Sequence, residues 1–364
     1  YEISCSLVGS EMCIRDSAII GTGIFATKSH LPTLTKSKYF KPYACYNRTI
    51  SKAEEFAKKA ETPLKVYQQL DDAFEDPEVD LIDALLPVQF NVDIITKAVK
   101  YKKNIVIEKP IAATLSQARE IVKISKENPD IFIAVNEHWV YLKAVTELQK
   151  AMSKIGNVVG FNYHSTGSFN FNNQYLTTSW RQHPEHIGGF LSDGGVHQLA
   201  LLTSVLGNVE SLNARTTQVR PQSGDVDVCW ALCKMESGVI GSFNYGSAFG
   251  NKPKHGYFEI LGDNGSIYYD FSPKTGDRIV LRTGGKTADD EKTEEEVKIA
   301  DENWSTSEEF ERVGRELNGE KGAVTCWPEV AFHHLAIVDA IVNSAKKNAE
   351  TVTVQKPWTI DLYT

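Results

Sequence analysis

A lysine follows directly after a stretch that has the pattern of a buried strand. Residues 105–107 (Ile-Val-Ile) are apolar on both faces, and Glu108, Lys109 and Pro110 come next. Charged groups beside a buried strand end cost desolvation free energy unless a partner or a ligand needs them. Lys109 is therefore a candidate for proton chemistry, and the alternative is a plain ion pair with Glu108 at the end of the strand.

A second pair of ionisable residues has helical spacing. Asp193 and His197 are four residues apart in "GGFLSDGGVH", so on a helix they share one face. An imidazole titrates near neutral pH and suits a general acid or base. The surrounding glycines, at 188–189 and 194–195, allow the backbone to approach a ligand closely. The alternative is a structural His–Asp pair.

A glycine-rich turn predicts a dinucleotide site near the start of the chain. The stretch "AIIGTGIFA" carries the pattern G-x-G-x-x-A between an apolar strand and a helical segment that Pro32 shortens. The first glycine permits a tight turn, the second lets the backbone approach a pyrophosphate, and a helix N-terminus attracts the phosphates. The residues expected at this turn are Gly21, Thr22, Gly23, Ile24, Phe25 and Ala26.

The residues about 20 positions later bear on the choice of cofactor. An acidic side chain there would hold the ribose 2′-hydroxyl of NAD, but the chain has Asn47, Arg48, Thr49 and, one helical turn on, Lys52. An arginine can bind a 2′-phosphate bidentately and stack on the adenine. The sequence therefore favours NADP (NADPH) over NAD, unless Arg48 simply faces solvent.

These residues need a scaffold, and the pattern of elements predicts one. Strand-like and helical segments alternate as far as residue 138, which is typical of a doubly wound parallel sheet with ligands at the carboxyl ends of its strands. Later runs such as "VCWALCKM", "VIGSFNYGSA" and "GYFEILGDNGSIYYDF" alternate as strands joined by turns. The segment 329–347 has the apolar spacing of an amphipathic helix. Its apolar positions are Phe332, Leu335, Ile337, Val338 and Ile341.

Three motifs in order resemble the glucose–fructose oxidoreductase / inositol dehydrogenase (Gfo/Idh/MocA) family. They are the G-x-G-x-x-A turn, Glu-Lys-Pro after a strand, and "GGFLSDGGVH". A closer likeness, carried by "IDALLP", "WRQHPEHIGGFLSDGGVHQLAL" and "YGSAFG", is to a budding-yeast NADP(H)-dependent oxidoreductase of that family. The resemblance implies an α/β protein: a Rossmann NADP-binding domain at 17–138 and a substrate-binding and oligomerisation α/β domain at 139–355, with a large, mostly antiparallel sheet.

The same resemblance implies roles for individual residues. It places Lys109 beside the nicotinamide, where we expect burial to lower its pKa and its ammonium to polarise a carbonyl. It makes His197 the proton shuttle, with Asp193 as its partner or as an acceptor for a substrate hydroxyl, and it implies a cis peptide before Pro110. Further cofactor contacts are expected from Leu86, Pro87, Asn91, Glu108, Lys109, Pro110, Trp180 and Arg181. Substrate contacts are expected from Glu137, His138, Trp139, Asp193 and His197.

The chain departs from the family pattern at two places. Asn91 stands in a loop where many relatives have a histidine, and "EHWVY" replaces Glu-Asn-aromatic-Arg, so that Val140 replaces the arginine. Losing that arginine weakens the case for an anionic or heavily hydroxylated sugar. Trp139 and Trp180, with Phe169 and Phe171 nearby, would suit a partly apolar or small aldehyde or ketone.

Composition excludes several other classes of protein. The chain has 364 residues, 41% hydrophobic, with a net charge of −8, which disfavours general binding of nucleic acid or anionic membrane. No apolar stretch approaches the length of about 20 residues that spans a bilayer. The histidines of 183–186 and 333–334 have no third ligand cluster, so we expect no metal. Scattered cysteines, with Cys229 and Cys233 read as small core residues, and no signal peptide indicate the cytoplasm.

Three segments are expected to lie outside the functional parts. Residues 1–16 resemble translated sequencing-adapter read-through, and Arg15 and Asp16 stand where a central strand should have buried residues. The acidic run 287–303 has the composition of a solvated loop or hairpin tip, and 356–364 of a tail.

The resulting functional hypothesis is an NADP-dependent oxidoreductase acting on a small-molecule carbonyl or alcohol, assembled as a homodimer or tetramer through the C-terminal sheet. The competing class is a non-catalytic NADP-binding sensor or regulator on the same fold. Reduction of a conjugated double bond by the same hydride is a second reading of the enzyme. Lys109, Asp193 and His197 together favour an enzyme.

Overall fold

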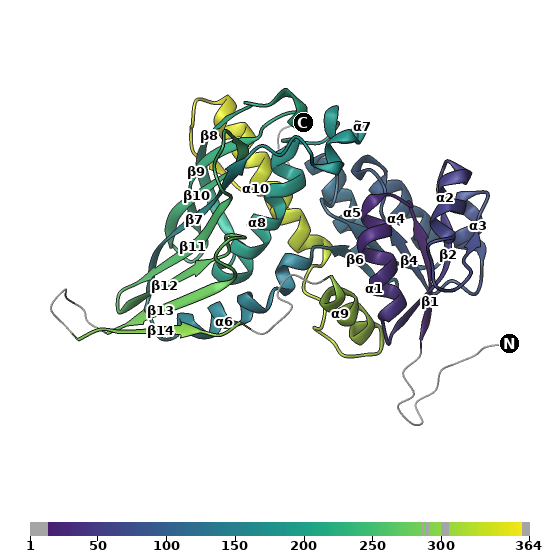
Figure 1. Cartoon of the computed structure of the whole chain (residues 1–364), viewed down its shortest axis with the longest axis horizontal. Helices are drawn as coiled ribbons and strands as arrows, with labels where there is room; N and C mark the ends of the chain where they lie inside the picture. Colours follow the sequence, from purple (N-terminus) through teal and green to yellow (C-terminus); the bar gives the residue numbers. More distant parts are fainter. Residues whose placement is uncertain (1–13, 285–286, 288–290, 300–305, 359–364) are drawn as a thin grey trace.

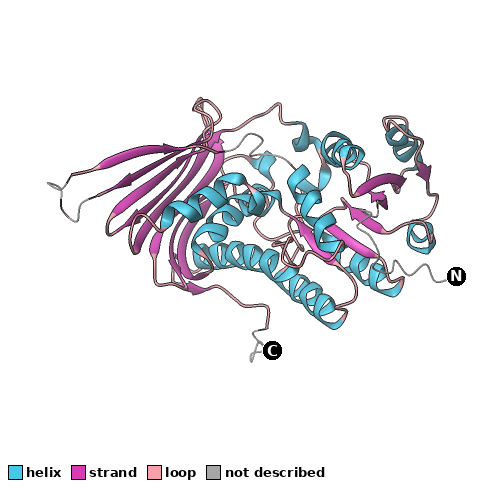
Figure 2. Ribbon diagram, turned by 90° about the horizontal axis from the view of Figure 1, so that it is seen from below, coloured by secondary structure: helices cyan, strands magenta, loops and turns pink. Residues whose placement is uncertain are grey.

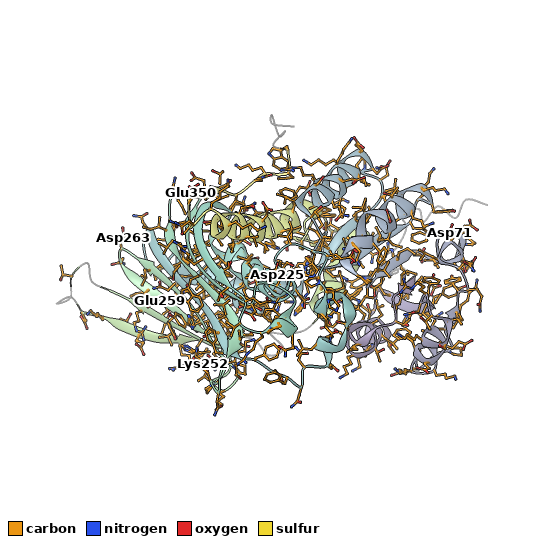
Figure 3. All side chains as sticks on the ribbon, turned by 90° about the horizontal axis from the view of Figure 1, so that it is seen from above. Asp71, Asp225, Lys252, Glu259, Asp263 and Glu350 are labelled. Carbon is orange, nitrogen blue, oxygen red and sulfur yellow. The ribbon has the colours of Figure 1, made fainter. Side chains whose placement is uncertain are left out.

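The computed structural model describes residues 14–284, 287, 291–299 and 306–358. Two domains lie side by side along the longest axis of the molecule (Figure 1). Asp71 lies at the outer end of the N-terminal domain, and Glu259 and Asp263 lie on the large sheet of the C-terminal domain (Figure 3). Within the described residues no helix is long and apolar enough to cross a membrane.

The N-terminal domain is a doubly wound parallel sheet, as the sequence predicts. Its strand order, β3-β2-β1-β4-β5-β6, is that of a dinucleotide-binding fold. The strands are β1 Arg15–Ile20, β2 Phe40–Tyr46, β3 Lys65–Val66, β4 Leu81–Ala84, β5 Asn104–Glu108 and β6 Ile133–Asn136. The helices between them are the π-helix η1 Ala26–His30, α1 Leu31–Lys36, α2 Ile50–Ala57, α3 Leu70–Glu75, the 3₁₀ turn η2 Val88–Phe90, α4 Asn91–Lys100 and α5 Leu115–Glu127.

The central strands are buried on both faces because helices cover the sheet on both sides. In β5 the side chains of Ile105, Val106 and Ile107 are fully buried, while Glu108 at the carboxyl end is only partly buried. The carboxyl ends of β1, β4 and β5 lie next to one another, because these three strands pair in parallel. This arrangement brings the glycine-rich turn and the lysine turn to the same edge of the sheet.

Strand β1 begins two residues before the predicted boundary at residue 17. The Arg15 main-chain N–H donates to the Tyr39 carbonyl at 2.8 Å, and that of Asp16 donates to the Asp80 carboxylate at 2.9 Å. Both side chains are partly exposed, because this end of the strand leaves the covered part of the sheet. Polar residues are therefore compatible with the strand here. Residues 1–13 of the segment predicted to be foreign lie outside the described residues.

The C-terminal domain is built on a nine-stranded sheet of order β14-β13-β12-β11-β7-β10-β9-β8-β15. All neighbours are antiparallel except β7 and β10, so the sheet is mixed but mostly antiparallel, as expected. Its strands are β7 Val158–Ser168, β8 Val209–Thr217, β9 Val228–Met235, β10 Ile240–Phe249, β11 His255–Gly262, β12 Gly265–Asp270, β13 Arg278–Thr283, β14 Thr293–Val297 and β15 Val352–Thr353. Helices lie against one face of this sheet only (Figure 2).

The helical elements of the C-terminal half lie mostly on that inner face. They are the 3₁₀ turn η3 His138–Tyr141, α6 Lys143–Met152, the 3₁₀ turn η4 Gln174–Thr177, α7 Ser179–Gln182, α8 Phe190–Leu206, the 3₁₀ turn η5 Pro221–Ser223, α9 Ser307–Leu317 and α10 Pro328–Lys346. In β9 the inner face carries Cys229, Ala231 and Cys233, all buried, whereas Trp230 and Leu232 are exposed. The reading of these two cysteines as small core residues is confirmed.

The acidic run 287–303, expected to be a solvated loop or a hairpin tip, forms part of a hairpin, and its residues 288–290 and 300–303 lie outside the described residues. It contains a strand, β14, which pairs with β13 at the edge of the sheet and has four exposed residues out of five. Acidic side chains on an exposed edge strand remain hydrated, and they also oppose edge-to-edge pairing with other chains. Arg278 and Arg282 of β13 form ion pairs with Glu296 and Glu294 of β14.

Two helices near the C-terminus join the domains. The apolar positions expected for 329–347 are all buried in α10, and the remaining faces are also largely buried, because α10 packs against β8 and α8 on one side and α5 on the other. Helix α9 returns to the N-terminal domain, where Phe310 and Val313 enter the same core as Phe40. The predicted division of the chain at 138/139 assigns α9 to the C-terminal domain, although this helix packs on the N-terminal one.

Candidate active site

A cavity of about 840 Å³ is lined by residues of both domains. Most of the residues predicted for the site line it: Gly21, Thr22, Gly23, Ile24, Phe25, Ala26, Asn47, Arg48, Lys52, Leu86, Pro87, Glu108, Lys109, Pro110, His138, Trp180, Arg181, Asp193 and His197. Thr49, Asn91, Glu137 and Trp139 are not among the lining residues. The cavity volume is within the range of about 300–1,000 Å³ that small-molecule and cofactor sites occupy.

The glycine turn fits the pyrophosphate of a dinucleotide. Gly21 has φ +99°, and a Cβ atom added there would lie 2.4 Å from the main-chain oxygen of Leu85, so only glycine is accommodated. A Cβ added at Gly23 would meet no protein atom within 4 Å, because this part of the backbone faces the open cavity. The helical run starts directly after it, at Ile24, and leaves main-chain N–H groups at this end.

Polar contacts tie the second cofactor segment to the first. The Asn47 amide donates to the Thr22 hydroxyl at 2.9 Å and accepts from the Thr49 main-chain N–H at 2.9 Å. The Thr22 hydroxyl donates to the main-chain oxygen of Lys52 at 3.3 Å. Arg48 is exposed, and neither Arg48 nor Lys52 has an ion-pair partner in the described part of the chain. These two cations remain available to a ligand in the cavity.

Lys109 and Asp193 meet across the two domains. The Lys109 ammonium donates to the Asp193 carbonyl at 2.7 Å and to its carboxylate at 3.2 Å, and Arg181 donates to the same carboxylate at 2.7 Å. Burial would raise the pKa of Asp193, but the charges and hydrogen bonds of Lys109 and Arg181 hold it well below its usual range. Asp193 is thus an anion that holds Lys109 in place, and it is a poor proton acceptor.

His197 has a different acidic partner from the one expected. Its Nδ1 lies 2.6 Å from Glu137 Oε1, and its ring stacks on Trp139 with a centroid distance of 5.5 Å. Burial would raise the pKa of Glu137, but the charge and hydrogen bond of His197 lower it to about 2. In the part of the chain that the structure describes, no hydrogen bond or ion pair joins His197 to Asp193, although both belong to helix α8. The Glu137 carboxylate orients the imidazole, as a carboxylate does in a catalytic His–acid pair.

His138 completes this end of the cavity. Its ring lies 5.2 Å from that of His197, and burial lowers its pKa to about 3, so its imidazole is neutral. Ligand atoms of Glu137, His138 and His197 lie within 4.8 Å of one another, which is a possible donor set for a metal ion. The hydrogen bond between Glu137 and His197 already accounts for their closeness, and the expectation of no metal stays a prediction.

The turn that carries Lys109 is held by Asn91. The peptide bond between Lys109 and Pro110 is cis, as the resemblance implied. The fully buried Asn91 side chain donates toward the carbonyls of Pro110 and Ile111, at 3.3 and 3.1 Å. Asn91 therefore supports the lysine turn from behind, and its predicted contact with the cofactor stays a prediction.

Several lining residues carried no signal strong enough to be predicted from the sequence. Tyr175, His186, Phe190, Gln222 and Ser223 line the cavity from loops and from the start of α8. In this region only Trp180 and Arg181 were predicted, from the resemblance to the family, and both line the cavity. Phe169 and Phe171 contact each other and Arg220, outside the cavity lining.

A buried ionic cluster behind the cavity was also missed. His30 lies between Asp83 and Glu108, at 2.8 and 2.9 Å. Asp83 gave one usable signal, since a carboxylate in the middle of a strand apolar on both faces needs a partner. The identity of that partner could not be read from the sequence, because His30 is 53 residues away along the chain.

Comparison with known proteins places the chain in a family. Residues 15–136 match the family model for the oxidoreductase family NAD-binding Rossmann fold (GFO_IDH_MocA), and residues 151–354 match its C-terminal alpha/beta domain. The chain is 47% identical over 347 residues to the uncharacterized protein YMR315W of Saccharomyces cerevisiae, covering 93% of this chain and 98% of that protein. It is 27% identical over 286 residues to dTDP-3,4-didehydro-2,6-dideoxy-alpha-D-glucose 3-reductase of Saccharopolyspora spinosa, covering 75% and 80%.

A solved structure agrees with these matches. An oxidoreductase from Thermotoga maritima superposes with a TM-score of 0.82 at 31% identity, covering 93% of this chain and 98% of that one. The chain belongs to the Gfo/Idh/MocA oxidoreductase family.

Proposed function

We propose that this protein is an NADP(H)-dependent oxidoreductase that transfers a hydride between the nicotinamide and a carbonyl or alcohol substrate. The observation that carries the proposal is the convergence of Lys109, His197 and the Gly21–Ala26 turn on one cavity. Family membership supports the hydride chemistry, because both domains match oxidoreductase models. A non-catalytic binding protein would have no need for a lysine and a histidine that are each held by a carboxylate.

The preference for NADP rests on the residues beside the ribose. Arg48 and Lys52 line the cavity, and Asn47 stands where NAD-specific proteins place an acidic side chain. Asn47 is held by Thr22 and by the main chain of Thr49, so its amide cannot turn away easily. A guanidinium and an ammonium at this place favour the extra phosphate of NADP over a bare hydroxyl.

The bound cofactor supplies the hydride, and the chain's own residues handle the oxygen and its proton. Lys109 donates a hydrogen bond to the carbonyl oxygen and stabilises the negative charge that develops there. Asp193 and Arg181 keep the lysine side chain aimed across the domain junction. His197 moves the proton at the same oxygen, and Glu137 keeps its ring oriented.

The lining of the cavity supports a neutral substrate. Arg181 and Lys109 already share the Asp193 carboxylate, so neither offers an unshared positive charge to an anionic group. Tyr175, Trp180 and Phe190 present aromatic surface. A small aldehyde or ketone, with an apolar part, fits this lining.

The outer face of the C-terminal sheet is proposed to pair with a second copy of the chain. Helices cover only the inner face (Figure 2), and the outer face exposes Trp230, Leu232, Ile240, Val159 and Leu261. Exposed apolar side chains grouped on neighbouring strands mark interaction surfaces.

The direct test is an assay of NADPH oxidation with a panel of neutral aldehydes and ketones, followed by the fall in nicotinamide absorbance. We expect turnover with at least one neutral carbonyl, and a lower KM for NADPH than for NADH. No oxidation with any member of the panel, in a protein that binds NADPH tightly, would favour the sensor.

A further inference from the structure

The side chain of His30 is completely buried between two carboxylates from different strands. His30 ends η1, Asp83 belongs to β4 and Glu108 is the last residue of β5. Nδ1 lies 2.8 Å from an Asp83 oxygen and Nε2 lies 2.9 Å from a Glu108 oxygen. Two ionised carboxylates can only accept hydrogen bonds, so between them both ring nitrogens carry a proton and the ring is an imidazolium.

The surroundings of the ring support that charge. Burial alone would lower the pKa of His30, but the charges and hydrogen bonds of Asp83 and Glu108 raise it to about 10. Glu309 of α9 also faces the cluster, and burial raises its pKa well above its usual value, so this carboxyl is neutral, as is the imidazole of His138, whose pKa burial lowers to about 3. The rings of Phe25 and Phe310 contact the imidazole edge-on, at 5.1 and 5.2 Å, and exclude water.

The cluster is one residue away from the proposed catalytic lysine. Glu108 lines the cavity, and its main chain continues directly into Lys109 and the cis peptide. The Glu108 side chain is anchored by His30, and the following carbonyls are anchored by Asn91. The Lys109 main-chain N–H donates to Asn136 at 3.3 Å, which is a longer contact. The lysine turn is therefore held from both sides, and His30 is the charged member of that support.

We propose that His30 is a positioning residue for Lys109: clamped by Asp83, it fixes Glu108 and so sets the place from which the lysine side chain enters the cavity. The proposal rests on the proposed function of Lys109. Nothing in the comparisons assigns a role to His30 or Asp83. His30 itself does not line the cavity, from which Phe25 and Glu108 separate it, so its action on the reaction is through the lysine turn.

The test is a double-mutant cycle between His30→Gln and Lys109→Ala, with NADPH affinity and turnover measured for each variant. We expect His30→Gln to lower kcat at least tenfold with the NADPH Kd changed less than about twofold, and to have no further effect on kcat in the Lys109→Ala background. A loss of kcat that is equally large in both backgrounds, or a parental kcat for His30→Gln, would overturn the proposal. Parental kcat for Lys109→Ala alone would instead overturn the proposed function.

Two further variants keep the result interpretable. His333→Gln is the control, since His333 is partly buried and accepts a hydrogen bond from the Val209 main-chain N–H in the C-terminal domain, and its kcat should be parental. If His30→Gln does not fold, Asp83→Asn replaces it, because an asparagine oxygen can still accept from Nδ1 while the charge is lost. Asp83→Asn should lower kcat by a smaller factor, again only when Lys109 is present. An Asp83→Asn effect that persists without Lys109 would count against the proposal.

Discussion

Arg48 offers the clearest test of cofactor choice at the level of one residue. Arg48→Ala should weaken NADPH binding roughly tenfold or more, the scale of one charge-assisted hydrogen bond of about 1.5–3 kcal/mol, and leave NADH binding unchanged. Fluorescence titration with both cofactors measures the two affinities. Lys59→Ala is the matched control, since Lys59 is an exposed cation just after α2 that does not line the cavity. Equal affinities of the parent protein for NADPH and NADH would refute the assignment.

Glu137 tests the unexpected partner of His197. Glu137→Gln should lower kcat by about 10²-fold or more, because an amide cannot stabilise the imidazolium or fix its tautomer. NADPH affinity should be preserved, since Glu137 does not line the cavity. Glu309→Gln is the control: this carboxyl is also fully buried but already neutral, so the amide should be tolerated with parental kcat. Steady-state kinetics give kcat for both variants. Parental turnover of Glu137→Gln would show that the His197–Glu137 pair has no part in the mechanism.

The turn between β1 and the first helix allows a comparison of two glycines within one element. Gly21→Ala should destabilise the fold by at least about 1–3 kcal/mol, because φ is positive and the new Cβ would meet the Leu85 carbonyl. Gly23→Ala should leave stability unchanged, because its Cβ would meet only open cavity, yet it should weaken NADPH binding by intruding on the pyrophosphate. Urea denaturation and cofactor titration separate the two effects. Parental NADPH affinity in Gly23→Ala would contradict the placement of the cofactor.

At the scale of elements, the sequence predicted those strands and helices whose apolar pattern depends only on their own burial. The alternation of apolar strands and helices gave the doubly wound sheet, because each segment's pattern depends on its own burial. Helix α9, by contrast, packs on the N-terminal domain through Phe310 and Val313, and no local pattern specifies which of two cores an apolar face will join.

In the candidate site, too, the individual residues could be predicted from the sequence but their contacts could not. Lys109, Asp193 and His197 were predicted from motifs, and all three line the cavity. Their pairing was not predicted: Asp193 holds Lys109, and His197 is held by Glu137, which lies 60 residues before it in the sequence. The His30–Glu108 contact spans 78 residues. Such contacts depend on the order of strands in the sheet and on how the domains meet, which residue spacing alone does not contain.

The whole molecule offers a test of assembly. The parent protein should be a dimer or tetramer at micromolar concentration, and Leu232→Glu should shift it to a smaller species by placing a charge in the outer face of β9. Multi-angle light scattering measures the mass directly. Lys58→Glu, an exposed change on the N-terminal domain, should leave the mass unchanged. A clean monomer in the parent protein would contradict pairing through the sheet.

The central claim is that Lys109 takes part in the reaction, and the turnover of Lys109→Ala with NADPH and a substrate from the carbonyl panel tests it most directly. We expect unchanged NADPH affinity, because the proposed contacts to the pyrophosphate and to the ribose phosphate come from Gly21–Ala26 and Arg48, which line the cavity. We expect kcat to fall by about 10²-fold or more, and Lys109→Arg to restore little of it, since a planar guanidinium cannot take the place of a compact amine between Asp193 and the substrate. Normal NADPH binding together with parental turnover in Lys109→Ala would contradict the account and leave the lysine as an ion-pair partner of Asp193.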